Sequence, residues 1–187
     1  GEGLKNLLSI FSSENISISP NTIVSSLANV ERAVTQLFLQ GQVGRIIGPI
    51  ETSWLIETSK DSTIVLSTAV YKSLLSLADV QSLICDVTPK DPQPLLRDLV
   101  STLITKMLQI LKEKPLLKTD QVIQAKLDME FLKRKFDSSS LLTTESVELM
   151  EKIDSILKNC AESDNFSAIW DKFESNWQGP FSNLFSF

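Results

Sequence analysis

Apolar residues recur every three or four positions through most of the chain, which is the spacing of one face of an α-helix. The clearest helix start is at Ser19 and Pro20, because serine is a good N-cap and proline fits the first helical position. We expect this helix to run to about Gln40, with Gly41 ending or loosening it. Its apolar positions predict a buried face made of Ile23, Leu27, Val30, Val34 and Leu37.

Further segments with the same spacing predict helices joined by short links. They lie at about 4–11, 61–84, 92–112, 120–136, 144–160 and from 163 onward. Asp91 and Asp120 are the expected caps of two of them, and the link at about 50–62 is expected to hold a buried Trp54. Two short runs, "NISIS" and "STIVLS", could each be a strand, but each stands alone. We therefore predict an all-α fold, an elongated bundle of about six to seven antiparallel helices.

The end of the chain is unusually aromatic. We expect a helical bundle segment over 1–162, followed by an aromatic helix and tail over 163–187. The aromatic side chains can fold back onto the bundle as a closing layer or can dock on a partner. Large aromatic residues often dominate protein interfaces, so the predicted partner-binding residues are Trp170, Trp177 and Phe181. The opening Gly1-Glu2-Gly3 resembles a cut end, so we also expect a piece of a longer protein.

Composition limits the classes of function. The hydrophobic fraction of 42% is enough for a core, and the net charge of −5 argues against a nucleic-acid-binding protein. There is no long apolar run typical of a transmembrane helix, and no signal peptide is evident. Cys85 and Cys160 are far apart, so we expect reduced core residues of a cytoplasmic protein, with a disulfide between them as the alternative.

Reactive motifs are lacking in the sequence. The chain has no histidine, which removes the commonest general base and the commonest metal ligand. Gly41 and Gly44 form a close glycine pair, but no phosphate-binding lysine follows them. Asp128 and Glu130 point to different sides of a helix at this spacing, so they are not a general acid/base pair. We expect no catalytic activity, no cofactor, no metal and no small-molecule substrate.

A basic cluster lies near the end of the helix predicted at 120–136. Lys133, Arg134 and Lys135 could contact anionic lipid or an acidic partner. The alternative is an ordinary solvated helix end, where positive charges also interact favourably with the helix dipole.

Four quoted runs carry a resemblance to a known group of proteins. They are "NVERAVTQLFLQGQVGRIIGPIE" (29–51), "LSTAVYKSLLSLADVQSLI" (66–84), "LLRDLVSTLITKMLQIL" (95–111) and "VIQAKLDMEFLKRKF" (122–136). Together they resemble the C-terminal helical region of subunits of multisubunit vesicle tethers, and most closely the exocyst subunit called Sec-five. Other such tethers are the conserved oligomeric Golgi complex and the Golgi-associated retrograde complex.

The resemblance implies a scaffold without catalytic residues. It implies a rod of stacked helical bundles that binds other subunits of a tethering complex and acts in exocytosis and protein transport. Such a chain would be cytoplasmic and peripheral to membranes. The alternative function is a helical adaptor or regulatory module that binds a partner peptide or an anionic membrane.

Overall fold

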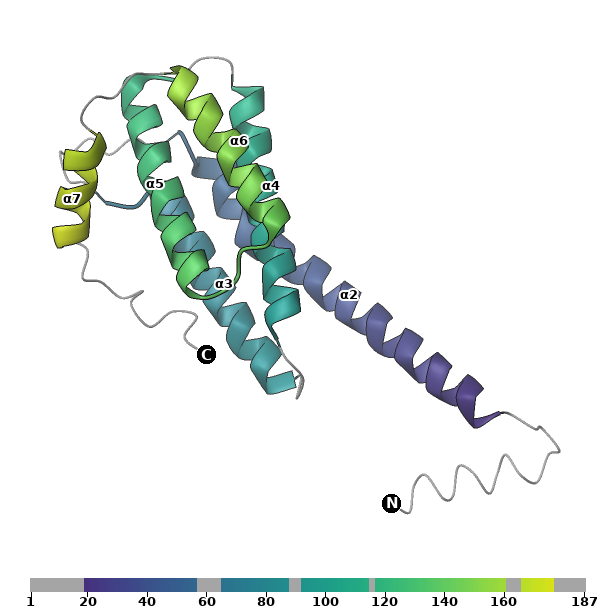
Figure 1. The fold of residues 1–187 in the computed structure, drawn as a ribbon. Helices are drawn as coiled ribbons and strands as arrows, with labels where there is room; N and C mark the ends of the chain where they lie inside the picture. The colour runs from purple at the N-terminus through teal and green to yellow at the C-terminus, as the bar shows by residue number, and fades with distance from the viewer. Residues whose placement is uncertain (1–18, 57–64, 88–91, 115–116, 161–165, 177–187) are drawn as a thin grey trace. The chain divides into compact units, whose positions relative to one another are not determined.

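The computed structural model describes residues 19–56, 65–87, 92–114, 117–160 and 166–176 (Figure 1). Within these ranges the chain forms helices and no strand, which confirms the all-α prediction. The helices are α2 (Pro20–Ser53), α3 (Thr68–Val87), α4 (Gln93–Glu113), α5 (Thr119–Ser138), α6 (Thr144–Cys160) and α7 (Phe166–Asn176). The helix predicted at 4–11 lies outside the described residues.

The chain divides between Gln40 and Gly41 into two compact units, and each is described by itself. In the first unit, the described residues are 19–40, which form the beginning of α2. As predicted, this helix begins at Pro20, and the backbone N–H groups of Thr22 and Ile23 donate to the carbonyl oxygen of Ser19 at 2.9 and 3.3 Å.

The predicted end of the first helix near Gln40 is wrong, and the alternative that Gly41 only loosens it agrees with the structure. Helix α2 continues through Gly41 to Ser53 because a glycine lowers helix stability by only about 1 kcal/mol, which burial of apolar side chains can offset. Ile46 and Ile50, in the second unit, are both 1% exposed. The helix is followed by Leu55 in the left-handed conformation, at φ 65°, a typical device for stopping a helix.

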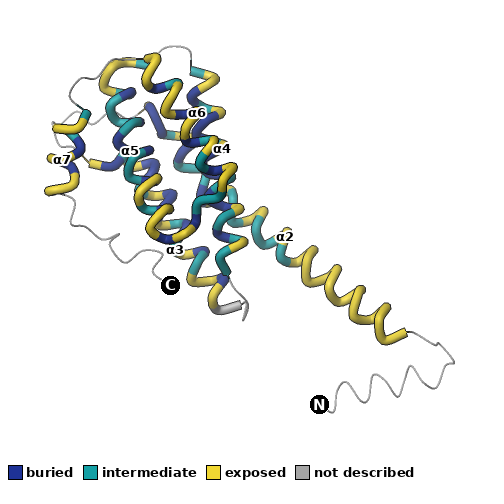
Figure 2. The backbone as a smooth tube through the Cα atoms, viewed as in Figure 1, coloured by how far each residue is buried: buried dark blue, intermediate teal, exposed yellow. Residues whose placement is uncertain are grey.

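The core of the second unit is centred on α4. Helix α6 packs against both α4 and α5, and α3 packs against α4 (Figures 1 and 2). Each large apolar side chain that becomes fully buried contributes about 1.5–3 kcal/mol to stability. The buried side chains of α4 form one wide apolar face, namely Leu96, Leu99, Val100, Leu103, Ile104, Met107, Leu108 and Leu111.

Three helix starts differ from the sequence-based prediction. Residues 65–67 are not helical, and α3 begins after Ser67, whose Oγ accepts a 3.3 Å hydrogen bond from the Val70 N–H. Asp120 lies in the first turn of α5 rather than capping it, because the helix begins at Thr119 with Lys118 as its N-cap. Pro92 is the N-cap of α4, while Asp91 lies outside the described residues.

Two further features bear on the predictions from composition. Cys85 and Cys160 are free thiols, and both are exposed rather than part of the core. In the portion of the chain that the structure describes, no helix is both long and apolar enough to cross a membrane.

Candidate functional site

The first unit carries a row of exposed aliphatic side chains on α2. We call it the α2 row, and it consists of Ile23, Leu27, Val30, Val34 and Leu37. The exposed fractions of Leu27, Val30, Val34 and Leu37 are 64, 59, 59 and 69%, and that of Ile23 is 38% (Figure 2). The sequence predicted these residues as a buried face, so that prediction is wrong: the spacing identified the apolar side of the helix but not what covers it.

The α2 row has the geometry of a coiled-coil seam. Its members are spaced alternately by four and three residues, which places them at the a and d positions of a heptad. Glu31 and Arg32 are the only charged residues between positions 20 and 40. Single exposed aliphatic residues are common, but a continuous row with so little charge around it is typical of a surface that another helix covers.

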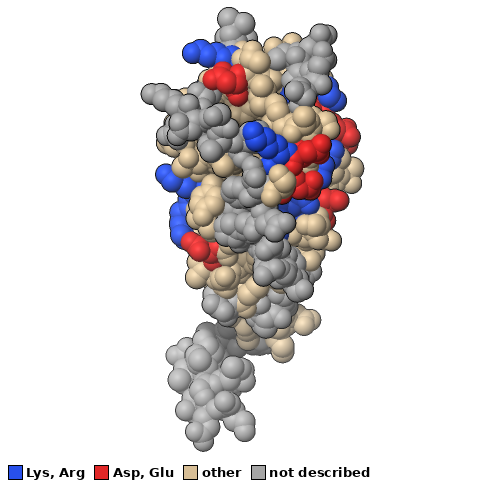
Figure 3. Space-filling model, turned by 90° about the vertical axis from the view of Figure 1, so that its left-hand side faces the viewer, with Lys and Arg blue, Asp and Glu red and all other residues tan. Residues whose placement is uncertain are grey.

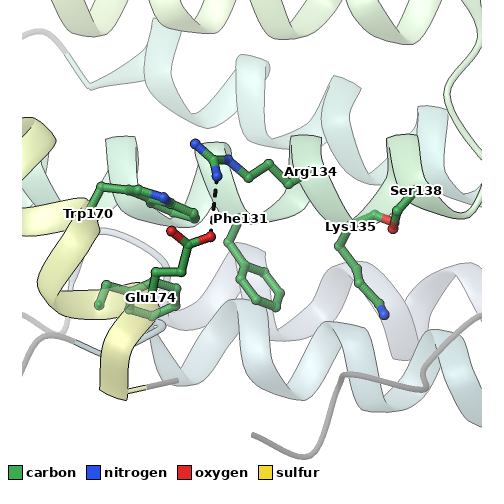
Figure 4. A pocket seen from close by; sticks show the side chains of 7 residues that line it. Phe131, Arg134, Lys135, Ser138, Trp170 and Glu174 are labelled. Atoms are coloured by element: carbon green, nitrogen blue, oxygen red, sulfur yellow. Dashed lines mark hydrogen bonds and ion pairs between the residues drawn. The ribbon is translucent and has the colours of Figure 1, made fainter. Parts of the chain in front are cut away.

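A second candidate site is a hollow of about 220 Å³ between α5 and α7, in the second unit (Figure 4). We call it the α5–α7 hollow. Its apolar part comes from three aromatic rings and its polar part from two cations, a hydroxyl and a carboxylate. The lining residues are Phe131, Arg134, Lys135, Ser138, Trp170, Phe173 and Glu174.

Aromatic contacts hold α7 against α5 at this hollow. The ring centroids of Phe131 and Phe173 are 5.9 Å apart at an interplanar angle of 85°, an edge-to-face arrangement. The Trp170 and Phe173 centroids are 5.3 Å apart. Phe173 is 1% exposed and Trp170 is 7% exposed, so these two aromatic residues of the tail segment pack back onto the bundle.

Arg134 is the central charged group of the hollow. Its guanidinium carbon lies 4.4 Å from the centroid of the Trp170 ring, a cation–π distance. Its Nε donates to Glu130 Oε1 at 2.7 Å, and its Nη1 lies 3.4 Å from Glu174 Oε1 (Figure 4). Glu130 therefore holds the guanidinium closely, whereas Glu174 makes only a long contact.

The indole N–H of Trp170 is buried and has no hydrogen-bond partner among the residues that the structure describes. A buried donor left unsatisfied costs about 1–3 kcal/mol. Nearby, partial burial lowers the pKa of Lys135. The lining of the hollow thus includes two basic side chains, the carboxylate of Glu174 and the residue that bears this orphan N–H.

The predicted basic cluster does not form one patch. Lys133 is exposed and does not line the hollow, Arg134 interacts with two glutamates, and Lys135 is half-buried. On the side of the molecule that Figure 3 shows, basic and acidic side chains are interspersed. Contact of these residues with lipid or with an acidic partner stays a prediction. Of the predicted partner-binding residues, Trp170 lies in the hollow, and Trp177 and Phe181 lie outside the described residues.

Sequence reasoning missed a buried polar centre at Asp128, which is 0% exposed. Its Oδ2 accepts the Trp54 indole N–H at 3.0 Å, and its Oδ1 accepts the Ser67 backbone N–H at 3.0 Å and Gln124 Nε2 at 3.1 Å. Burial raises the pKa of Asp128 to about 6, and the hydrogen bonds oppose part of that increase. A signal existed, because helical spacing places Asp128 on the buried side between Ala125 and Leu132.

The Asp128 centre is suited to holding helices together rather than to chemistry. It lies on α5 and binds groups from the end of α2 and the start of α3, without access to solvent. Among the described residues, no three acidic or cysteine side chains gather as a metal-binding group.

The family of this chain is shown by its match to a known family model. A family model for exocyst complex component Sec5 matches residues 7–173. The chain belongs to the Sec5 family. No match was found among curated proteins or among solved structures. Membership confirms the resemblance noted in the sequence and makes the chain an exocyst-type component of vesicle tethering. The matched Sec5 region includes the whole α2 row and, in the hollow, both Trp170 and Phe173.

Proposed function

We propose that this Sec5-family chain is an interaction segment that joins another exocyst subunit through the α2 row. The observation that carries the proposal is the exposure of Leu27, Val30, Val34 and Leu37, each more than half exposed and all on one side of a helix. The mechanism is passive: binding buries these side chains, and no bond is made or broken.

The geometry of the row defines the kind of partner. Residues 23–37 span about 21 Å along a helix, at 1.5 Å per residue, which is two heptads. A partner helix with its own apolar heptad could insert side chains between those of the row. Burial of each aliphatic side chain contributes about 1.5–3 kcal/mol, and part of the total offsets the entropy lost on association.

The proposed role implies where in the cell the chain acts. As a scaffold within an exocyst-type complex it would act in the cytoplasm, at the periphery of the membranes where vesicles dock, and contribute to exocytosis. The match to the Sec5 family supports a place in an exocyst-type complex, and the exposure of the α2 row supports contact with another subunit of that complex.

The test is pairwise binding of this chain to individually purified exocyst subunits. The variant Leu27→Asp/Val34→Asp places two charges within the α2 row, and we expect it to weaken binding to the partner subunit at least about tenfold. The matched control is Asn29→Asp/Gln36→Asp, which adds the same charge at the same spacing on the opposite, also exposed, side of α2. The control should bind as the unchanged chain does.

Two results would count against this function. One is that no exocyst subunit binds the unchanged chain. The other is that the row variant and the control variant bind equally well. Circular dichroism of both variants would check that helix content is unchanged.

A further inference from the structure

We infer that the α5–α7 hollow recognises an aspartate or glutamate side chain presented by a protein partner. This site lies in the second unit and does not depend on the α2 row, so it goes beyond the function proposed above. Three observations lead to an acidic side chain as the occupant.

The first observation is the unused donor. Trp170 is 7% exposed, and within the described ranges of the chain its indole N–H has no acceptor. Trp54, the other described tryptophan, is 1% exposed and donates its N–H to Asp128. Buried donors are normally satisfied, so we take the orphan N–H of a residue that lines the hollow as a sign of an acceptor from outside the described residues.

The second observation is the charge around this donor. Arg134 is held over the Trp170 ring at 4.4 Å, and Lys135 lines the same hollow. Hydrogen bonds from cations to carboxylates are stronger than those to neutral acceptors. A carboxylate therefore fits better than a carbonyl or an amide. Its aliphatic stem would pack on the rings of Phe131 and Phe173.

The third observation is that the carboxylate of Glu174 already contacts Arg134 as the proposed ligand would, but at a longer distance. Its carboxylate lies 3.4 Å from Arg134 Nη1, longer than the 2.7 Å bond from Nε to Glu130, and its side chain is 62% exposed. Glu174 can therefore move aside at little cost, while Glu130 keeps the guanidinium in place. An incoming carboxylate would replace Glu174 on Arg134 and bring an acceptor within reach of the indole N–H (Figure 4).

The experiment follows the indole N–H signals of the whole chain by two-dimensional ¹⁵N NMR. Substitution of each tryptophan by phenylalanine in turn assigns the signals. The probe is the peptide acetyl-Ala-Glu-Leu-amide, and its control is acetyl-Ala-Gln-Leu-amide, which has the same shape without the charge. We expect the glutamate peptide to shift the Trp170 signal in a saturable manner and to leave the Trp54 signal in place.

Two variants that each remove one positive charge are compared, one inside the hollow as the test and one outside it as the control. Arg134→Gln should weaken the binding of the glutamate peptide at least about tenfold, as expected for loss of a charged hydrogen bond. Lys133→Gln removes the same charge one residue earlier, outside the hollow, and should change binding less than about twofold, the size of a screened surface effect. Glu174→Gln should strengthen binding because it removes the internal competitor.

Several outcomes would overturn the inference. These are a Trp170 signal that neither peptide moves, equal shifts with both peptides, or equal losses in Arg134→Gln and Lys133→Gln. If the hollow were filled by another part of this chain, neither peptide would move the signal, so that result also counts against it. An unchanged Trp54 signal shows in each case that the fold is intact.

Discussion

The indole N–H of Trp54 donates a 3.0 Å hydrogen bond to Oδ2 of Asp128, 74 residues further along the chain. The other carboxylate oxygen accepts the backbone N–H of Ser67, at the start of α3. Two glutamines of α5 continue this pattern: Gln121 donates to the carbonyl oxygen of Leu55, and Gln124 donates to that of Val65 at 2.9 Å. One polar side of α5 therefore binds the residues that precede and the residues that follow the connection between α2 and α3.

Loss of this carboxylate should destabilise the fold. Asp128→Ala leaves the buried N–H groups of Trp54 and Ser67 without an acceptor, and we expect the free energy of unfolding to fall by about 2–4 kcal/mol. The measurement is urea unfolding followed by circular dichroism. Asp154→Ala, which removes an exposed carboxylate paired with Lys158, is the control and should change stability by less than about 0.5 kcal/mol. Equal effects of the two substitutions would contradict the structural role of Asp128.

Stability should also depend on pH through Asp128. Its folded-state pKa of about 6 lies above the ordinary value of 3.8, so between these values the folded chain binds a proton that the unfolded chain has lost. The contribution of this group is therefore fully present below about pH 4 and is lost as the pH rises through 6. The total change is about 3 kcal/mol, from about two pKa units at 1.4 kcal/mol each.

The measurement compares the unchanged chain with Asp128→Asn, which does not titrate. The unfolding free energy of the unchanged chain should fall relative to that of Asp128→Asn as the pH rises from 4 to about 7. A difference that is constant over this range would show that the Asp128 pKa is not raised.

Two leucines should respond very differently to the same substitution. Leu103 on α4 is 1% exposed, so Leu103→Ala should destabilise the chain by about 2–5 kcal/mol through lost burial and the cavity it leaves. Leu27 in the α2 row is 64% exposed, so Leu27→Ala should change stability by less than about 0.5 kcal/mol. Thermal and urea unfolding measure both effects. A large loss in Leu27→Ala would mean that the row is buried within the isolated chain.

Helix α7 should depend on its aromatic contacts. It has 11 residues, and isolated helices of this length are marginal in water. Phe173→Ala removes the ring that meets Phe131 edge to face, and we expect amide hydrogen exchange across α7 to accelerate at least about tenfold while α4 stays protected. The exposed Ser175→Ala is the control and should leave exchange in α7 unchanged. Equal protection in both variants would indicate that other contacts hold α7.

Local spacing accounts for what could be predicted of the fold and the site. The apolar faces of the helices were readable because the helix repeat aligns residues three and four apart, as the buried row of α4 shows. Trp54 was also correctly placed in the interior. The sequence left open whether Gly41 ends α2 or only loosens it, because the burial of Ile46 and Ile50 that offsets the glycine involves side chains distant in sequence.

The sequence by itself determined that the chain is helical, where its apolar faces lie and which family it resembles, since these depend on residue spacing and type. Only the tertiary structure decided which faces are covered. It left the α2 row exposed, placed Trp170 beside Arg134, and buried Asp128 among donors from three helical regions. The reason is that burial and pairing depend on residues far apart in sequence. The same helical pattern of apolar residues occurs both in a face buried in the core and in a face left exposed.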